Sequence, residues 1–559
     1  MARTLNPSRR SLLAGAGLSA LALTLAACGA SSTGSSSTSG SAGSAEVSPG
    51  GRLGILTSGT DINWDPAKSQ SMPVTSLVLV HRRLTTWSLS EGSEVEVVAD
   101  LATDTGTVSE DGLSWTYTLK DGLFFEDGTA ITSAHVKYGL ERSFAPALAG
   151  GLGYHKTLLA GTEGYEGPFD GAHLDSIETP DDKTIVFHLR QTYGDWPWIV
   201  AQPAFSPVPE DKDDVATYAR TPIASGPYRV EQYSTGVSAT LVRNEHWSAD
   251  TDDVRLALPD TIVFELGQDE STSIQRIIAS AGDDAHAFCA DRVAAAQLAQ
   301  VSGNAEAAER LATPAEGGPL QYLAINTERV TDVEVRQAIS RAVDKTAVVS
   351  ALGGQLGASA ATTYIAPGIP GRVEYDLYPT DVEAVAATLA GKEVGELILL
   401  AANDTATQAV AQAVQQALTE AGLRVTIDPQ ESEVVSERAT QGDGSTYDLA
   451  IGSWNADFPS ASAYIQPLFA SSEIGGGGYN ISRYSDPEVD AAIEEAIATL
   501  DPAEAGAKWA AIDQRVAAQA PVVPLANRRN SFLAGSGVTD FFVESYPAYP
   551  NYLVVGVSA

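Results

Sequence analysis

Residues 109–136 read SEDGLSWTYTLKDGLFFEDGTAITSAHV and carry a dense set of structural signals. Residues 115–119 combine aromatic and β-branched side chains, a composition that favours a strand. Asp-Gly pairs at 121–122 and 127–128 are typical turn sequences, and they bracket residues 123–126. We therefore expect a strand that is followed by a second, short strand between two turns.

Strand and helix signals alternate on both sides of this stretch. Residues 184–189 predict another strand from the same kind of composition. Val335, Ile339 and Val343 share one helical face, and Asp332 stands where an N-cap is expected. Because this alternation extends over the whole chain, the sequence indicates an α/β fold.

Two aspartate-proline pairs mark further helices near the C-terminus. Asp486 and Asp501 each precede a proline, and Asp at the N-cap with Pro at the first helical position is a common helix start. The helices that they begin are expected to run to about residues 500 and 520. The sequence PVVPL at 521–525 then predicts an extended segment.

Length and charge limit the possible functions. The chain has 559 residues, with 34 Lys and Arg against 71 Asp and Glu, so its formal net charge is −37. This length corresponds to about three or four domain-sized units. A strongly acidic chain repels polyanions, so the composition argues against a nucleic-acid partner. A solvated acidic surface explains much of the charge, which favours cationic ligands only weakly.

The first 27 residues have the pattern of an export signal. Three arginines precede an apolar run over 12–27, which is too short and too rich in glycine for a spanning helix. The run ends in Leu-Ala-Ala before Cys28, and this ending resembles the lipobox of bacterial lipoproteins. We therefore predict a signal peptide over 1–27 and lipid attachment at Cys28. The pair Arg9-Arg10 also resembles a twin-arginine signal, so the Sec and Tat export routes both stay open.

A tether and a second cysteine complete this picture. Residues 28–51 are rich in Gly and Ser, and such a segment behaves as a flexible tether. Together with the acylated cysteine, the tether predicts a folded body held at the outer face of the cytoplasmic membrane. The one further cysteine, Cys289, has apolar neighbours and no partner for a disulfide in the mature chain. We expect it to be a buried, inert thiol.

The sequence lacks the motifs that mark catalysis, metal binding or nucleotide binding. Its seven histidines form no HxH or HExxH pair, so a metal site has no support. There is no GxSxG elbow, and the glycine run 475–478 lacks the lysine and the strand–helix context of a phosphate-binding loop. The sequence therefore predicts no catalytic residue, no metal and no cofactor.

Beyond the stretch 109–136, four more landmark segments follow along the chain. They are SGPY at 225–228 with RNEHW at 243–247, LAIN at 323–326 with VRQAI at 335–339 and DK at 344–345, YNISRYSDPEVD at 479–490, and APVVPL at 520–525. Together the five resemble the peptide/nickel family, family 5, of extracytoplasmic solute-binding proteins that serve ABC importers. Within that family the chain is most similar to oligopeptide-binding lipoproteins of high-GC Gram-positive bacteria.

The resemblance implies an α/β fold of the class II periplasmic-binding-protein type, a two-lobed clamp with an additional third domain. The lobes of such a clamp close around a ligand by a hinge, so the ligand has to contact both sides of the cleft. Carried onto this sequence, lobe I comprises residues 52–84, 204–320 and 527–559, the extra domain comprises 85–203, and lobe II comprises 321–526.

The resemblance also nominates a ligand site. In peptide-binding relatives, the aspartate of a Trp-x-x-Asp motif pairs with the α-ammonium of the ligand, and here Trp454, Asn455, Ala456 and Asp457 form that motif. A desolvated ammonium needs a carboxylate partner, so Asp457 is expected to bind it and Trp454 to wall the pocket. A capping aspartate and a core tryptophan are the structural alternative.

A second strip of contacts is expected from lobe I. Gln70, Ser71 and Met72 follow a Trp-Asp-Pro sequence that resembles the family's Leu-Asp-Pro, and the resemblance nominates them as contacts to the peptide backbone. An ordinary loop is the alternative for these three residues. Tyr154 and His155, in the extra domain, are expected to border the cleft.

The leading hypothesis is a lipid-anchored receptor that binds oligopeptides in an interlobe cleft and delivers them to the membrane subunits of an ABC permease. This hypothesis implies a monomer. Alternatives are a non-peptide solute such as a metal chelate, a sugar or an antibiotic-like compound, and a sensor built on the same clamp. A secreted hydrolase is the least favoured alternative, and the net charge weakly favours cationic peptides among possible ligands.

Overall fold

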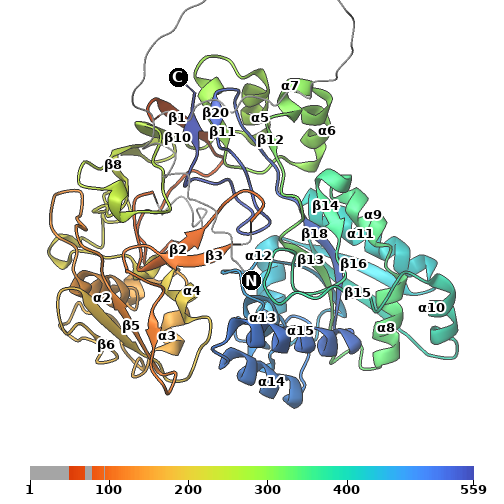
Figure 1. Ribbon diagram of the computed structural model, residues 1–559. Helices are drawn as coiled ribbons and strands as arrows, with labels where there is room; N and C mark the ends of the chain where they lie inside the picture. The colour runs from red at the N-terminus through yellow and green to blue at the C-terminus, as the bar shows by residue number, and fades with distance from the viewer. Residues whose placement is uncertain (1–48, 70–78, 94, 559) are drawn as a thin grey trace, which may run out of the picture. The chain divides into compact units, whose positions relative to one another are not determined.

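The computed structural model describes residues 49–69, 79–93 and 95–558, and three larger sheets organise this part of the chain (Figure 1). The predicted leader, Cys28 and most of the tether lie outside the described residues. The same holds for Gln70, Ser71 and Met72.

The first larger sheet has the strand order β11-β1-β10-β9-β8. Strand β1 is parallel to β10 and β11, whereas β9 is antiparallel to β10 and β8. Cys289 ends β11 and is 1% exposed, which confirms the predicted buried thiol. The strands and the helices of the same stretch are β1 (Arg52–Leu56), β8 (Tyr228–Ser234), β9 (Ser238–Arg243), β10 (Thr261–Glu265), β11 (Ala287–Cys289), α5 (Glu270–Ala279), α6 (Ala295–Gly303) and α7 (Ala305–Ala308).

The second larger sheet has the order β14-β18-β13-β17-β15-β16. Strand β15 is parallel to β16 and β17, and β13 is antiparallel to β17 and β18. Its strands are β13 (Leu320–Ile325), β14 (Ala358–Ala360), β15 (Glu396–Ala402), β16 (Arg424–Gln430), β17 (Leu449–Trp454) and β18 (Val522–Arg528). Its helices are α8 (Val333–Ala342), α9 (Lys345–Ala351), α10 (Val382–Leu389), α11 (Thr405–Glu420), α12 (Ser432–Thr440), α13 (Ser462–Phe469), α14 (Pro487–Ile497) and α15 (Pro502–Ala518).

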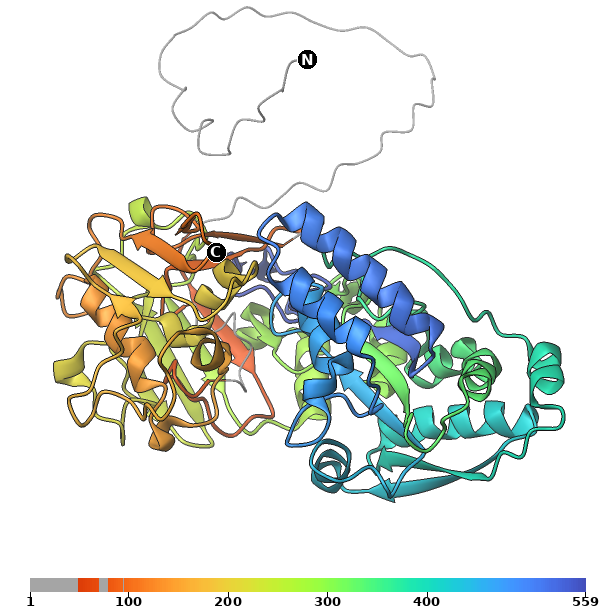
Figure 2. The ribbon, with the colours of Figure 1, turned by 90° about the horizontal axis from the view of Figure 1, so that it is seen from below.

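Helices pack on both faces of this second sheet. Successive residues of a strand point to opposite sides, so a single strand contributes side chains to two separate cores. Along β13, Tyr322 and Ala324 join a core shared with α13, α14 and α15, whereas Leu323 and Ile325 join a core shared with α8, α9 and α11. Helices α14 and α15, in blue, lie side by side (Figure 2). The sheet is therefore packed on both faces, and it positions the residues that follow its strands.

The third larger sheet is antiparallel, with the order β4-β5-β7-β6. Its strands and helices are β4 (Thr107–Val108), β5 (Ser114–Thr118), β6 (Ile177–Glu178), β7 (Thr184–His188), α2 (Ser133–Arg142), α3 (Tyr154–Leu158) and α4 (Trp196–Val200). The described residues also form three two-stranded sheets. They are β2 (Thr85–Ser88) with β3 (Glu96–Ala99), β12 (Leu311–Ala312) with β19 (Phe532–Leu533), and β20 (Val538–Thr539) with β21 (Gly556–Val557).

Most of the elements predicted from the sequence are confirmed. Strands β5 and β7 pair with each other, and β18 occupies the predicted extended segment. The side chain of Asp332 caps α8, and Asp486 and Asp501 cap α14 and α15. Both C-terminal helices end two or three residues before the predicted positions, at Ile497 and Ala518.

The predicted short strand at 123–126 is wrong. The structure has only an isolated bridge between Phe124 and Ala130 there. Gly122 and Gly128 both have positive φ, and the backbone N–H of Phe125 already bonds Thr129 within the turn. Two turns so close together leave too few residues for a ladder, so the segment folds back on itself.

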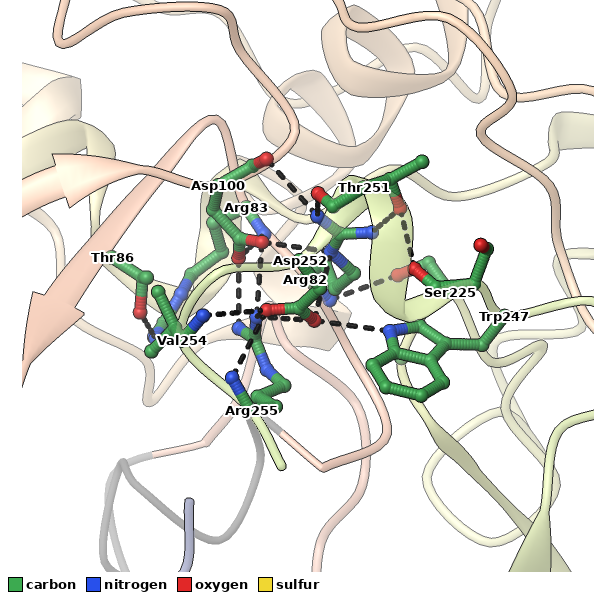
Figure 3. A network of polar contacts seen from close by, with 12 residues as sticks. Arg82, Arg83, Thr86, Asp100, Ser225, Trp247, Thr251, Asp252, Val254 and Arg255 are labelled. Carbon is green, nitrogen blue, oxygen red and sulfur yellow. Dashed lines mark hydrogen bonds and ion pairs between the residues drawn. The ribbon is translucent and has the colours of Figure 1, made fainter. Parts of the chain in front are cut away.

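A buried group of charges joins three separate parts of the chain (Figure 3). Asp100 accepts bonds from Arg82 at 2.7 Å and from Arg255 at 2.8 Å, and Arg255 also pairs with Asp252 at 3.0 Å. These side chains are at most 2% exposed, and Trp247 donates to Asp252. Although burial opposes ionisation, the two guanidinium groups hold the pKa of Asp100 well below its usual range. We call these four charged residues the arginine network.

The predicted domain limits stay a prediction. Strands β13 and β18 run one or two residues across the predicted limits of lobe II, since β13 begins at Leu320 and β18 ends at Arg528. The two strands pair with each other close to these ends, with Leu320 opposite Asn527. Both connections between the predicted lobes therefore start as antiparallel neighbours, with a register shift between Gln321 and Tyr322.

Candidate functional site

The Trp-x-x-Asp motif lies where strand β17 ends. This strand is held between β13 and β15, and its last residue is Trp454. A Cβ at Gly452 would stand 2.3 Å from the ring of Tyr322, so only glycine allows this close approach. Nε1 of Trp454 donates to the carbonyl of Ala463 at 2.7 Å, which ties the loop to helix α13. The loop that carries Asp457 is therefore anchored at both ends.

Asp457 contacts three distant parts of the chain. The hydroxyl of Tyr154 donates to its Oδ2 at 2.7 Å. Its backbone carbonyl accepts from the hydroxyl of Tyr546 at 2.9 Å and from Nε2 of Gln202 at 3.3 Å. These contacts hold the carboxyl group at a junction between residues 154–202, 457 and 546.

The carboxylate of Asp457 has no cationic partner among the described residues. No Lys, Arg or His in that part of the chain lies within ion-pair distance of it, in contrast to Asp100. Burial raises the pKa of Asp457, and the hydrogen bond from Tyr154 opposes the rise. A buried carboxylate without a counter-ion is costly, and a cation supplied by a ligand would remove that cost.

A cavity of about 180 Å³ opens beside this carboxylate. We call it the aromatic cavity, because five of its lining residues are aromatic. It is lined by Tyr154, Tyr193, Trp454, Phe458, Ser462, Ala463, Gln466, Pro467, Glu473 and Tyr479. The rings of Tyr154 and Phe458 meet edge to face at 5.5 Å, and those of Trp454 and Tyr479 lie 4.9 Å apart. The walls thus come from residues that lie up to 325 positions apart (479 − 154).

A second buried carboxylate lies next to the aromatic cavity. Asp195 accepts from Oγ of Ser460 at 2.8 Å and from Oγ of Ser462, a cavity residue. Burial raises the pKa of Asp195, and the two serine hydroxyls oppose the rise. Gly194 holds this segment in place: its N–H bonds the carbonyl of Ile497 at 2.8 Å.

Two amide oxygens near Asp457 are buried without a hydrogen-bond partner in the described part of the chain. They are Oε1 of Gln202 and Oδ1 of Asn455. Gln202 is 1% exposed and already contacts Asp457 through its other amide atom. Unpaired buried acceptors are uncommon, so both are suited to accept from a donor on a ligand.

The nominated residues do not all come together. Tyr154 and Trp454 line the cavity, and Asp457 bonds Tyr154 there, whereas Asn455 is not among the lining residues and has a buried, unpaired side-chain oxygen. Ala456 is 4% exposed and packs into the core, so its side chain offers no ligand contact.

His155 lies in the interior of the protein, away from the cavity lining. It is 1% exposed, its Nε2 bonds Oγ of Ser143 at 2.7 Å, and its ring meets those of Phe144 and Phe205 edge to face. Burial lowers the pKa of His155 to about 3, so the ring is neutral. The structure therefore gives no support to His155 as a ligand contact, because helix α3 turns it inward while Tyr154 faces the cavity.

Several cavity residues carry no signal that sequence reasoning used. Tyr193 and Asp195, which lies next to the cavity, belong to no motif, and Glu473 lies two residues before the glycine run 475–478, which by itself indicated no ligand site. Tyr479 begins one of the five landmark segments, which is the one signal that could have drawn attention to it. In the part of the chain that the structure describes, no group of side chains could hold a metal ion, and no helix is long and apolar enough to cross a membrane.

Known proteins are similar to this chain in both sequence and fold. The family model described as bacterial extracellular solute-binding proteins, family 5 Middle, matches residues 96–476. The probable D,D-dipeptide-binding periplasmic protein DdpA of Escherichia coli (strain K12) is 27% identical over 422 residues, which cover 73% of this chain and 74% of the relative. The glutathione-binding protein GsiB of the same strain is 25% identical over 459 residues, covering 78% and 82%.

Solved structures agree with this result. The clavulanic acid biosynthesis oligopeptide binding protein 2 matches with a TM-score of 0.85 and 30% identity over 92% of this chain and 97% of that protein. The murein tripeptide binding protein MppA, in its unliganded open form, shares the fold with a TM-score of 0.75 and 20% identity, over 92% and 99%. The α/β fold of the binding-protein type is thereby confirmed. This chain belongs to family 5 of the bacterial extracellular solute-binding proteins.

Proposed function

We propose that this protein binds peptides with a free amino terminus and that the carboxylate of Asp457 pairs with the ligand's ammonium group. The observation that carries the proposal is a buried carboxylate, bonded to Tyr154, that has no cation within reach among the described residues. A charge-assisted bond to an ammonium is about twice as strong as a neutral one. The names of the similar proteins, which refer to a dipeptide, glutathione and an oligopeptide, support peptides as the solute class.

The setting of the site supports capture of a ligand between two bodies. Tyr154 and Asp195 belong to the predicted extra domain, while Asp457 and Trp454 belong to the predicted lobe II. A ligand between them would stabilise the arrangement in which both sides make contact, as a hinged clamp requires. Gln70, Ser71 and Met72 remain proposed contacts from lobe I.

The proposed role is delivery of the bound peptide to an ABC permease from a lipid-anchored position. The lipobox-like ending before Cys28 and the Gly/Ser-rich tether support the anchor. A Cys28→Ala variant should leave the membrane fraction for the medium. Continued association with membranes after this substitution would count against lipid anchoring.

Calorimetric titration tests the ammonium pairing. We expect the purified protein to bind a free tripeptide and to bind its N-acetylated form much more weakly, because acetylation removes the positive charge. In the Asp457→Asn variant the free and acetylated tripeptides should bind with similar, weak affinity. A wild-type protein that binds both forms equally would show that Asp457 does not hold the amine.

Native mass spectrometry identifies what the protein carries from its host. A set of masses that match short peptides and are lost on partial unfolding would support the proposed solute class. A single non-peptide mass would replace the peptide with another solute. Release of shortened peptides from an added peptide pool would instead indicate hydrolysis.

A further inference from the structure

The aromatic cavity combines two features that a neutral side-chain pocket does not need. Five aromatic rings form its walls, and Glu473 is its one acidic lining residue. Among the lining residues there is no Lys, Arg or His, and Glu473 forms no ion pair within the described chain. An aliphatic ligand group would gain nothing from a half-buried carboxylate, which costs free energy to desolvate.

Glu473 is held at the cavity by the local fold. It ends a short helical turn at Ser471–Glu473, and the glycine loop that follows returns the chain so that Asn480 bonds the Glu473 carbonyl at 3.1 Å. A Cβ at Gly478 would stand 2.3 Å from that same carbonyl oxygen, so the return requires glycine. The run 475–478 therefore places Glu473 beside Tyr479, its neighbour on the cavity wall.

Aromatic faces and a carboxylate together form a cation site. The negative face of a tyrosine or tryptophan ring attracts a guanidinium or ammonium group, and the attraction is larger when the cation is desolvated. Trp454 and Tyr479, 4.9 Å apart, offer two such rings next to Glu473. Asp195 adds a second carboxyl group next to the cavity, where it accepts a hydrogen bond from the cavity residue Ser462.

We propose that the aromatic cavity binds a positively charged side chain, guanidinium or ammonium, from one of the first two residues of the peptide, with Glu473 as its counter-ion. This inference rests on the proposed function, because it places the ligand's amine on Asp457. The hydroxyl of Tyr154 touches Asp457 while its ring lines the cavity, so a side chain close to the amine reaches the cavity. The protein is accordingly selective for basic residues near the amino terminus.

The test compares arginine with citrulline, which has nearly the same shape and no charge. Calorimetric titration uses Ala-Ala-Ala, peptides with Arg at the first, second or third position, and the matching citrulline peptides. We expect wild-type protein to prefer Arg over citrulline at least tenfold at position one or two and less than threefold at position three. The variant Glu473→Gln should reduce the preference below threefold.

Two further variants keep the test decisive. Glu494→Gln, on the exposed side of α14, removes the same charge away from the cavity and should keep the full preference. Tyr479→Leu removes a wall residue that is 50% exposed, so the fold should tolerate it, and it should lower the preference for arginine at least threefold.

The outcomes separate this inference from the proposed function. If Ala-Ala-Ala binds but arginine and citrulline peptides bind equally, the cation site is wrong and peptide binding stands. A preference for arginine that survives in Glu473→Gln, or that appears only at the third position, also overturns the assignment. If none of the peptides binds, the proposed function itself fails.

Discussion

The arginine network and the carboxylates around the aromatic cavity are two solutions to the same physical problem. In the network, every carboxylate meets a guanidinium at 3.0 Å or less, and the side chains are at most 2% exposed. At the cavity, Asp457, Asp195 and Glu473 meet only hydroxyl and amide donors from the described residues. The pKa of Asp100 is held low, whereas burial raises the pKa of all three cavity acids.

The difference shows which buried charges serve the fold and which are available to a ligand. A paired charge is satisfied within the chain, and removing one partner leaves the other stranded. An unpaired carboxylate makes the ligand-free protein less stable, and it recovers that free energy when a cation binds. Substitutions should therefore affect stability in the network and binding at the cavity.

The largest expected effect is on stability in the arginine network. Asp100→Asn leaves Arg82 and Arg255 with one acid fewer, so the free energy of unfolding should fall by about 3–5 kcal/mol. Urea unfolding followed by circular dichroism measures this change. The exposed control Asp175→Asn should change it by less than about 0.5 kcal/mol. A small effect at Asp100 would mean that the network does not stabilise the fold.

The matching substitution at the cavity should act on binding instead. Asp457→Asn should weaken free-amine peptides by about 2–5 kcal/mol, because it removes one partner of a buried pair. The free energy of unfolding of the peptide-free variant should be equal to or above that of the wild type, since an uncompensated buried charge is lost. A loss of stability as large as that of Asp100→Asn would place Asp457 with the structural charges.

Asp513 is a buried carboxylate without an ion-pair partner among the described residues, and it lies outside the aromatic cavity. Its Oδ1 accepts from the hydroxyl of Tyr375 at 2.8 Å, no ion pair reaches it among the described residues, and burial raises its pKa to about 7. A folded pKa above the unfolded value gives stability at low pH that is lost as the pH rises toward 7. Between pH 5.5 and 7.5 this group should cost about 1–2 kcal/mol.

Urea unfolding at both pH values measures the Asp513 contribution. The variant Asp513→Asn cannot ionise, so its stability should change less between pH 5.5 and 7.5 than that of the wild type. An identical pH dependence in both proteins would mean that Asp513 is ionised at pH 5.5 already. Asp513 would then not be an example of an unpaired carboxylate whose pKa is raised by burial and that serves no ligand.

The smallest expected effect comes from one hydroxyl. Tyr154→Phe keeps the aromatic wall of the cavity and removes the bond to Asp457, so affinity for free-amine peptides should fall by about 1 kcal/mol. Tyr165→Phe, which removes a bond to the Ala172 carbonyl outside the cavity, is the matched control. Calorimetric titration of both variants with one tripeptide measures the difference. Equal losses in the two variants would rule out a specific role for the Tyr154 hydroxyl.

Local rules predicted the elements that depend on neighbouring residues. The Asp-Pro starts of α14 and α15 and the pairing strands β5 and β7 follow from side chains within a few positions of each other. The prediction of a strand at 123–126 failed because two adjacent turns compete with a strand for the same backbone groups. Helix ends were also predicted two or three residues too late, since the terminal turn is set by packing and capping.

The sequence alone determined the motif that carries Asp457, its family and the caps that shape the C-terminal helices. Only the tertiary structure decided what surrounds that carboxylate. Tyr154, Asp195 and Glu473 are far apart along the chain, and no pattern links them. Whether His155 or Tyr154 faces the cavity depends on the rotation of one helical turn. Pairing of a buried charge depends on distance in space, so the structure was needed to tell the paired Asp100 from the unpaired Asp457.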